Sequence, residues 1–115
     1  MTIPDEPGGN TKIPLVLPKK VAILYSDVKR EYFGTEQEYL SEEGADIYAG
    51  EVAKYVAKMG IDVTTIAGDD QLASKLQKFN PDMALNLIDS VRGSATLGSS
   101  IPGVLEVLHI PYTGA

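Results

Sequence analysis

Cysteine is absent from this chain of 115 residues. The protein therefore has no disulfide framework, no thiol nucleophile and no zinc–thiolate site, and its composition fits a reducing compartment. The chain also lacks any apolar run that approaches about 20 residues, the length a membrane-spanning helix needs. Its N-terminus places no basic region ahead of an apolar stretch, so we expect no signal peptide and a cytoplasmic location.

Positive charge is also scarce, because 10 Lys and Arg stand against 16 Asp and Glu, which gives a net charge of −6. Nucleic acids and anionic membranes bind to cationic surfaces, so we expect neither as a partner. The Gly-x-Gly-x-x-Gly pattern of dinucleotide sites does not follow the first predicted strand, and the pattern Gly-x-x-x-x-Gly-Lys-Ser/Thr is absent. A nucleotide site within this chain is therefore poorly supported.

The remaining composition is that of a soluble globular domain, with 43% hydrophobic and 23% charged residues. The length is enough for one domain with a core of its own. Residues 1–18 hold four of the seven prolines and a Gly-Gly pair, a composition that predicts an extended N-terminal arm. We therefore expect an arm over residues 1–18 and a single domain over residues 19–115.

Strand and helix patterns alternate along this domain. Apolar or β-branched runs predict strands at residues 20–27, 62–67, 82–88 and 110–114. Apolar residues at helical spacing predict helices at residues 44–59, 69–79 and 101–108. Residues 28–42 are expected to form a long loop or the frayed start of a helix, and residues 89–98 a Gly/Ser loop. The alternation predicts an α/β, Rossmann-like three-layer fold, with a parallel sheet of about four strands and helices on both faces.

In the helix at 44–59, two sets of small and apolar residues indicate the face that packs on the sheet. The predicted core stripe consists of Tyr48, Val52, Tyr55, Val56 and Met59. A ridge that allows close approach to the sheet consists of Ala45, Ala49, Ala53 and Ala57. Gly60 is expected to end this helix in a left-handed conformation.

The last predicted helix carries one apolar stripe, formed by Ile101, Leu105 and Leu108. Pro102 suits the first turn, where its missing N–H costs no intrahelical hydrogen bond. His109, the single histidine, follows the helix. We expect it to have a capping or surface role at the negative end of the helix dipole.

Ligands of such sheets bind at the carboxyl ends of the strands, which directs attention to the loops after the first and third strands. Each loop supplies a carboxylate, an arginine and a hydroxyl within a few residues: Ser26, Asp27 and Arg30 in one, Asp89, Ser90 and Arg92 in the other. Such groups could bind a zwitterion, with carboxylates facing its ammonium and a guanidinium facing its carboxylate. The alternative is that they only end strands and cap helices.

Four acidic residues lie close together before the first predicted helix: Glu36, Glu38, Glu42 and Glu43. They lack the spacing of a metal site, whose oxygen ligands must converge on one ion. We therefore interpret this cluster as a solvated face.

The stretch LGSSIPGVLEVLHIPYTGA resembles the end of the N-terminal domain of D-alanine–D-alanine ligases. In that family a Gly-rich loop precedes a helix of the pattern x-x-Pro-x-Leu-Leu-Glu-x-Leu-x-Ile-Pro-Tyr-Thr-Gly. The matching residues here are Pro102, Leu105, Glu106, Leu108, Ile110, Pro111, Tyr112, Thr113 and Gly114. The strands at 20–25 and 82–88 also resemble the family, so the resemblance covers residues 20–115 and is most specific at its end.

The resemblance implies an ATP-grasp enzyme in which ATP and Mg²⁺ bind between a central and a C-terminal domain, both absent from this chain. Such an enzyme phosphorylates the carboxylate of one amino acid, and the amine of a second attacks the acyl phosphate. A true D-alanine–D-alanine ligase would thereby supply a peptidoglycan precursor. This chain would then be a substrate-binding domain without catalytic residues, inactive alone and part of a homodimer, with D-alanine or an analogue as substrate.

In the family, a glutamate after the first strand receives the ammonium of the first substrate, and Glu31 falls at that position. With Arg30, Asp89, Ser90 and Arg92 it completes the predicted substrate-binding set. Both loops depart from the family pattern, since the Gly-Gly pair after the first strand is replaced by Ser-Asp, and the His-Gly pair after the third by Asp-Ser. These changes indicate a different amino-acid partner more than a different fold.

Two alternatives of other classes remain open. A receiver-like signalling domain would use Asp89 as phosphoacceptor, Asp27 as metal ligand and Thr113 after the fourth strand. Against it, the chain lacks a fifth strand carrying the required lysine, and only one acid directly follows the first strand. The other alternative is a non-catalytic module that dimerises through its first helix and its proline-rich arm.

Overall fold

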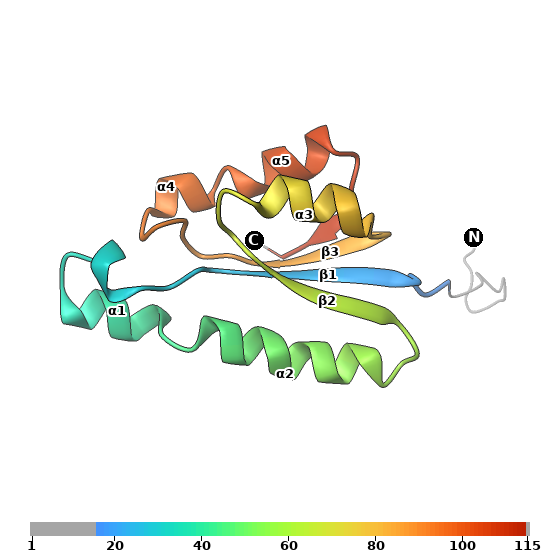
Figure 1. Cartoon of the computed structure of the whole chain (residues 1–115), viewed down its shortest axis with the longest axis horizontal. Coiled ribbons are helices and arrows are strands. Elements are labelled where there is room, and N and C mark those ends of the chain that lie inside the picture. The colour runs from blue at the N-terminus through green and yellow to red at the C-terminus, as the bar shows by residue number, and fades with distance from the viewer. Residues whose placement is uncertain (1–15, 115) are drawn as a thin grey trace, which may run out of the picture.

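The computed structural model describes residues 16–114 and contains one four-stranded sheet (Figure 1). The predicted arm at residues 1–18 lies largely outside the described residues. The strands are β1 (Lys20–Tyr25), β2 (Asp62–Ala67), β3 (Met83–Leu87) and β4 (Tyr112–Thr113), and they run parallel in the order β2-β1-β3-β4. The predicted α/β fold with an all-parallel sheet is confirmed.

Helices cover both faces of this sheet. Figure 1 shows α2 (Ala45–Ala57) alone on one face, with α3 (Leu72–Phe79), α4 (Ala95–Gly98) and α5 (Ile101–Val107) on the other. The 3₁₀ helix η2 (Arg30–Tyr32) follows β1, and α1 (Glu36–Glu42) lies beyond the carboxyl ends of the strands. Within residues 16–114, no helix combines the length and the apolar character needed to cross a membrane.

The core has two halves, one on each side of the sheet. Ala22 and Leu24 of β1 pack with the helices α3 and α5, whereas Val21 and Ile23 pack with α2. All four of these side chains are buried. A continuous apolar run is therefore needed in β1, because alternate side chains of a strand point to opposite faces and both faces are covered.

The face that α2 presents to the sheet differs from the predicted stripe. Val52 and Val56 pack against the core as predicted, but Tyr48, Tyr55 and Met59 are 61%, 66% and 61% exposed. The fully buried residue of this helix is an alanine, Ala49. Because small alanines allow the closest approach to the sheet, Ala49 and Ala53 of the predicted ridge face the core with the two valines, whereas Ala57 is exposed and the larger side chains lie to one side.

The predictions for the helix ends are confirmed in their main points. Ile101 and Leu105 of α5 are buried, and Leu108 packs against them. Gly60 has a φ of +81°, and His109, which follows α5, is exposed with a φ of +58°. Both residues adopt the left-handed conformation that commonly ends helices.

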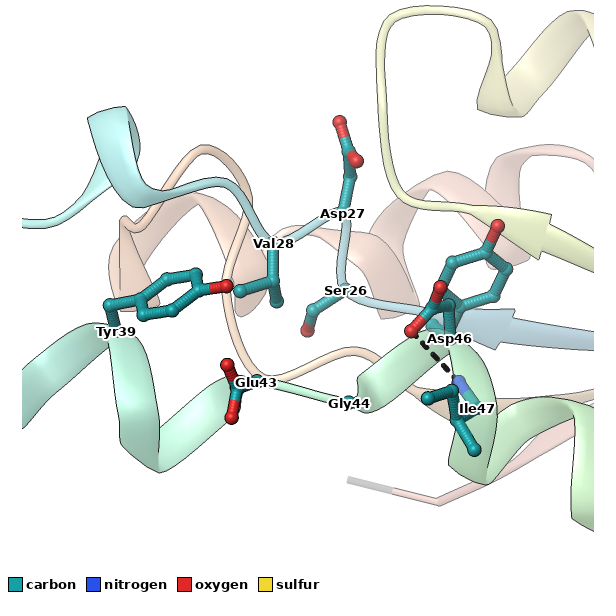
Figure 2. Close-up of a pocket in the computed structure, with 9 residues that line it drawn as sticks. Ser26, Asp27, Val28, Tyr39, Glu43, Gly44, Asp46 and Ile47 are labelled. Atoms are coloured by element: carbon teal, nitrogen blue, oxygen red, sulfur yellow. Dashed lines mark hydrogen bonds between the residues drawn. The ribbon is translucent and has the colours of Figure 1, made fainter.

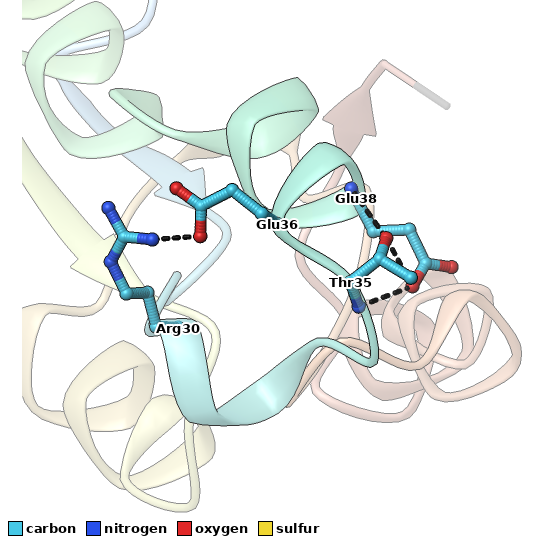
Figure 3. Close-up of polar contacts among 4 residues, drawn as sticks. All are labelled: Arg30, Thr35, Glu36 and Glu38. Carbon is cyan, nitrogen blue, oxygen red and sulfur yellow. Dashed lines mark hydrogen bonds and ion pairs between the residues drawn. The ribbon is translucent and has the colours of Figure 1, made fainter.

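The predicted loop at residues 28–42 is wrong in part, because it contains η2 and α1. The Thr35 hydroxyl accepts a hydrogen bond from the Glu38 N–H at 3.1 Å, and Glu38 Oε1 accepts one from the Thr35 N–H at 3.1 Å (Figure 3). This capping box starts α1 without any apolar periodicity. Residues 89–98 likewise contain the single turn α4, which is capped by the Ser94 hydroxyl.

Candidate functional site

The loops that follow β1 and β3 meet at the carboxyl edge of the sheet. β1 and β3 are neighbours, and the chain passes from β1 to α2 on one face but from β3 to α4 and α5 on the other. Crevices of such sheets form where neighbouring connections diverge in this way. The Ser26 hydroxyl accepts hydrogen bonds from the N–H groups of Asp89 at 2.8 Å and Ser90 at 3.3 Å. Both acceptor positions of this buried hydroxyl are therefore filled, and its proton alone is left to donate.

A tight turn in the second loop packs against η2. Val91 and Ser94 exchange backbone hydrogen bonds at 3.0 and 2.9 Å, and the two residues between them, Arg92 and Gly93, have φ values of +49° and +75°. Two consecutive positive φ values are the mark of a type I′ turn. A Cβ atom at position 93 would overlap the backbone carbonyl of Tyr32, so only glycine allows the two loops to lie this close.

A pocket of about 520 Å³ opens between the end of β1 and the break between α1 and α2 (Figure 2). In Figure 2 the Tyr39 ring and the Glu43 carboxylate enter from α1 and its C-terminal end, and Ser26 enters from the end of β1. The lining residues are Tyr25, Ser26, Asp27, Val28, Tyr39, Glu43, Gly44, Asp46 and Ile47. Three of them carry carboxylates and none is a lysine or arginine.

A second pocket of about 430 Å³ lies on the other side of the same break. Its lining residues are Ser41, Glu42, Glu43, Gly44, Ala45, Tyr48, Asn86, Leu87, Ile88, Asp89 and Gly114. The two pockets share Glu43 and Gly44. Gly44 has a φ of +84°, which lets the chain turn from α1 into α2 at this point.

The charge of the first pocket favours an organic cation. Burial raises the pKa of Tyr25, and the negative charges of Asp46, Asp27 and Asp69 raise it further. Over residues 16–114, no group of three His, Asp or Glu side chains is placed to hold a metal ion. The receiver-like alternative, which needs such a cluster beside Asp89, therefore gains no support.

The break between α1 and α2 is bonded to the loop after β3. The Ser90 hydroxyl donates to Glu42 Oε1 at 2.6 Å, and Ser90 is only 2% exposed. Glu42 is half-buried, and its neighbour Glu43 is exposed. The carboxylates of this break thus lie over the same edge of the sheet as Ser26.

The predicted substrate-binding residues do not line one common pocket in the structure. Asp89 lines the second pocket. Ser90 lines neither pocket, and its hydroxyl donates its hydrogen bond to Glu42. Glu31 is exposed on η2 and lines neither pocket. Arg92, in the turn at residues 91–94, is also exposed and lines neither pocket. Arg30 lies outside both pockets, with its guanidinium 4.5 Å from the centre of the Tyr39 ring.

Arg30 is further engaged by an ion pair with Glu36 (Figure 3). Both side chains are exposed, so this pair joins η2 to α1 at the surface rather than within a pocket.

Sequence reasoning did not place Glu42 and Glu43 beside the pockets, because it grouped them with a solvated acidic face. Glu36 and Glu38 do lie on such a face, where they pair with Arg30 and cap α1. The sequence signal that separates the two pairs is the Thr-x-x-Glu box at 35–38. It starts a helix that ends just before Gly44 and therefore places the later two acids at the break.

Comparison with known proteins shows which enzymes this chain resembles in sequence. No protein-family model matches this chain, and no solved structure matches it significantly. A D-alanine–D-alanine ligase of Rickettsia felis is 30% identical over 95 residues, which are 83% of this chain and 26% of that protein. Ligases of the same name from Methylocella silvestris and Azorhizobium caulinodans are 43% and 38% identical over 61 residues, 53% of this chain and 19% of each protein.

The chain thus spans about a quarter or less of the length of these relatives. Its matches and its parallel α/β fold are consistent with an N-terminal domain of such a ligase. The resemblance indicated by the C-terminal motif is confirmed, and the chain is similar in sequence to the D-alanine–D-alanine ligases.

Proposed function

We propose that this chain is the N-terminal substrate-binding domain of an ATP-dependent carboxylate–amine ligase of the D-alanine–D-alanine ligase type. The sequence similarity supports the class of enzyme. One observation carries the role within it: an acidic pocket, lined by no cationic side chain, at the edge where β1 and β3 end. Such a pocket attracts the ammonium group of an amino acid.

Glu43 is the first candidate to receive this ammonium, because it lines both pockets and lies opposite the end of β1. The resemblance assigns the same role to Glu31, which lies on η2 and lines neither pocket, and which is therefore the second candidate. For the carboxylate of the substrate, Arg92 is a better candidate than Arg30, because Arg30 is already engaged by Glu36 and by the Tyr39 ring.

In the parent enzyme, ATP would phosphorylate the carboxylate of one amino acid, and the amine of the second would displace phosphate from the acyl phosphate. The residues described here offer no cluster that fits Mg²⁺, so we assign no step of phosphoryl transfer to this chain. Its part is to bind and orient an amino acid, and the 115 residues alone are expected to form no ADP. With D-alanine as substrate, the product would be a peptidoglycan precursor made in the cytoplasm.

Binding of D-alanine and N-acetyl-D-alanine to the purified chain tests this function by calorimetry or by NMR titration. D-alanine should bind, and the acetylated compound should not, because its amine carries no charge. Glu43→Gln should weaken binding roughly 10- to 100-fold, the worth of a hydrogen bond between charged groups. Glu51→Gln, which alters an exposed acid paired with Lys54 on α2, is the matched control.

Glu31→Gln decides between the two candidates. A loss with Glu31→Gln and none with Glu43→Gln would move the ammonium to η2. Equal binding of D-alanine and its acetylated form would contradict recognition of the amine.

We further propose that the parent protein is a homodimer and that α2 contributes to its interface. Tyr48, Tyr55 and Met59 expose one apolar stripe along this helix. On the exposed side of the helix next to this stripe, Glu51 lies at the middle, and Lys54 and Lys58 lie toward the C-terminal end. Two copies of α2 packed antiparallel would bury the stripe and place opposite charges next to each other, as a two-fold axis requires.

A further inference from the structure

We propose that the buried hydroxyl of Ser90 is a positioning group, which holds the α1–α2 break and its acids Glu42 and Glu43 over the carboxyl edge of the sheet. The part of this proposal that concerns ligand affinity rests on the proposed amino-group site. The part that concerns the placement of α1 stands on the contacts of Ser90 alone.

The helix α1 has no apolar anchor in the core. None of the residues of α1 or η2 is buried. The side chains of the two elements contact each other, through the Arg30–Glu36 ion pair, the Arg30 guanidinium over Tyr39, and the rings of Phe33 and Tyr39 at 6.1 Å. These contacts bind α1 to η2, which itself packs against the turn at residues 91–94, so they tie α1 to the sheet only indirectly.

Ser90 supplies a link from α1 to the sheet. Its hydroxyl donates to Glu42 at 2.6 Å across 48 positions of sequence, and a hydrogen bond to a carboxylate is stronger than one between neutral groups. Ser90 is itself held, because its N–H and that of Asp89 both donate to the Ser26 hydroxyl at the end of β1. A continuous path of hydrogen bonds therefore runs from β1, through Ser26 and the loop after β3, to the end of α1.

The position of Ser90 separates its role from that of the acids. Ser90 lines neither pocket, whereas Glu42 lines the second and Glu43 lines both. At the break itself, Gly44 supplies no side chain to cap α2. Ser90 thus acts on a ligand through Glu42, and its loss should displace Glu43 as well.

Amide hydrogen exchange and D-alanine binding, measured on the same variants of the full chain, test the proposal. Ser90→Ala should speed exchange about 10-fold in α1, for example at the Glu43 N–H that donates to the Tyr39 carbonyl. It should also weaken D-alanine binding about 5-fold or more. Ser90→Thr keeps the hydroxyl and should restore both, and Ser74→Ala, at an exposed position of α3, is the matched control.

Glu42→Gln separates position from charge. The amide oxygen can still accept from Ser90, so exchange in α1 should stay near the wild-type rate while D-alanine affinity falls. Should Ser90→Ala fail to fold, Glu42→Ala removes the same hydrogen bond from the half-buried partner and should speed exchange in α1 equally.

Two results overturn the proposal. Exchange in α1 that matches the Ser74→Ala control would show that Ser90 does not hold the helix. Faster exchange with unchanged affinity would show that holding the helix does not position the acids. If the wild-type chain binds no D-alanine, the proposed function fails, and the exchange rates still decide whether Ser90 holds α1.

Discussion

Gly93 shows how one residue sets the distance between two loops. Its positive φ and the Tyr32 carbonyl beside it leave no room for a Cβ atom. The loops after β1 and β3 can therefore interlock only with glycine at this position. Gly50, in the interior of α2, provides a contrast on the same chain, because a Cβ atom there would meet no heavy atom within 4 Å.

Gly93→Ala should lower the free energy of unfolding by about 2 kcal/mol or more, because it combines left-handed strain with an overlap on backbone atoms. Gly50→Ala should raise it by about 0.5–1 kcal/mol, since alanine favours a helix interior over glycine. Urea unfolding of both variants and the wild type measures the two changes. Equal effects of the two substitutions would contradict the packing described for the turn.

The candidate site was predictable in its place but not in its residues. Because the carboxyl ends of parallel strands share one edge, Ser26, Asp89 and Ser90 were expected near one another, and they are joined by hydrogen bonds. Which side chains are engaged in hydrogen bonds depends on partners that are distant in sequence. Glu42 reaches Ser90 across the chain, and no local pattern indicates such a contact.

At the scale of elements, β1 and β3 are registered by a side chain as well as by their ladder. Asp82 precedes β3, and its Oδ2 accepts hydrogen bonds from the N–H groups of Lys19 and Lys20 at 2.6 and 3.0 Å. These two hydrogen bonds hold the start of β3 against the start of β1. They also lower the pKa of the Asp82 carboxyl from its ordinary value of 3.8.

Asp82→Asn should therefore reduce stability at neutral pH, and the deficit should shrink in acid. A carboxyl whose pKa is lowered by folding contributes its stabilisation above the unfolded value of 3.8 and loses it as the pH falls through the lower folded value. Urea unfolding at neutral pH and at several values below 3.8 gives the comparison. A deficit that stays constant over this range would argue against the two backbone hydrogen bonds as its cause.

Elements with a strong apolar pattern were predictable from the sequence, and polar ones were not. α3 coincides closely with its predicted range, because burial of Leu72 and Leu76 in the core dictates its periodicity. β2 coincides with a β-branched run in which only Ile66 is buried. The helix α1 was not predicted, because a capping box and surface contacts stabilise it rather than burial of apolar side chains. In α2 two candidate faces were present, and packing against the sheet selected the smaller side chains.

At the scale of the whole molecule, the apolar stripe formed by Tyr48, Tyr55 and Met59 on α2 is left exposed. Sedimentation of the wild type should show a dimer, and Tyr55→Asp should weaken association at least about 10-fold by placing a charge in the interface. Val107→Asp is the matched control, since Val107 is an exposed apolar residue of α5 on the opposite side of the sheet. Equal effects of the two substitutions on association would exclude α2 as the contact.

Glu43 and Gly44 line both pockets and therefore form a wall that the two pockets share. A molecule that pushes against it from one side narrows the space on the other. A large ligand bound in one pocket should therefore weaken the binding of a ligand in the other, whereas two small ligands should bind nearly independently. The size of a ligand would then influence which molecules bind together, without any additional hydrogen bond.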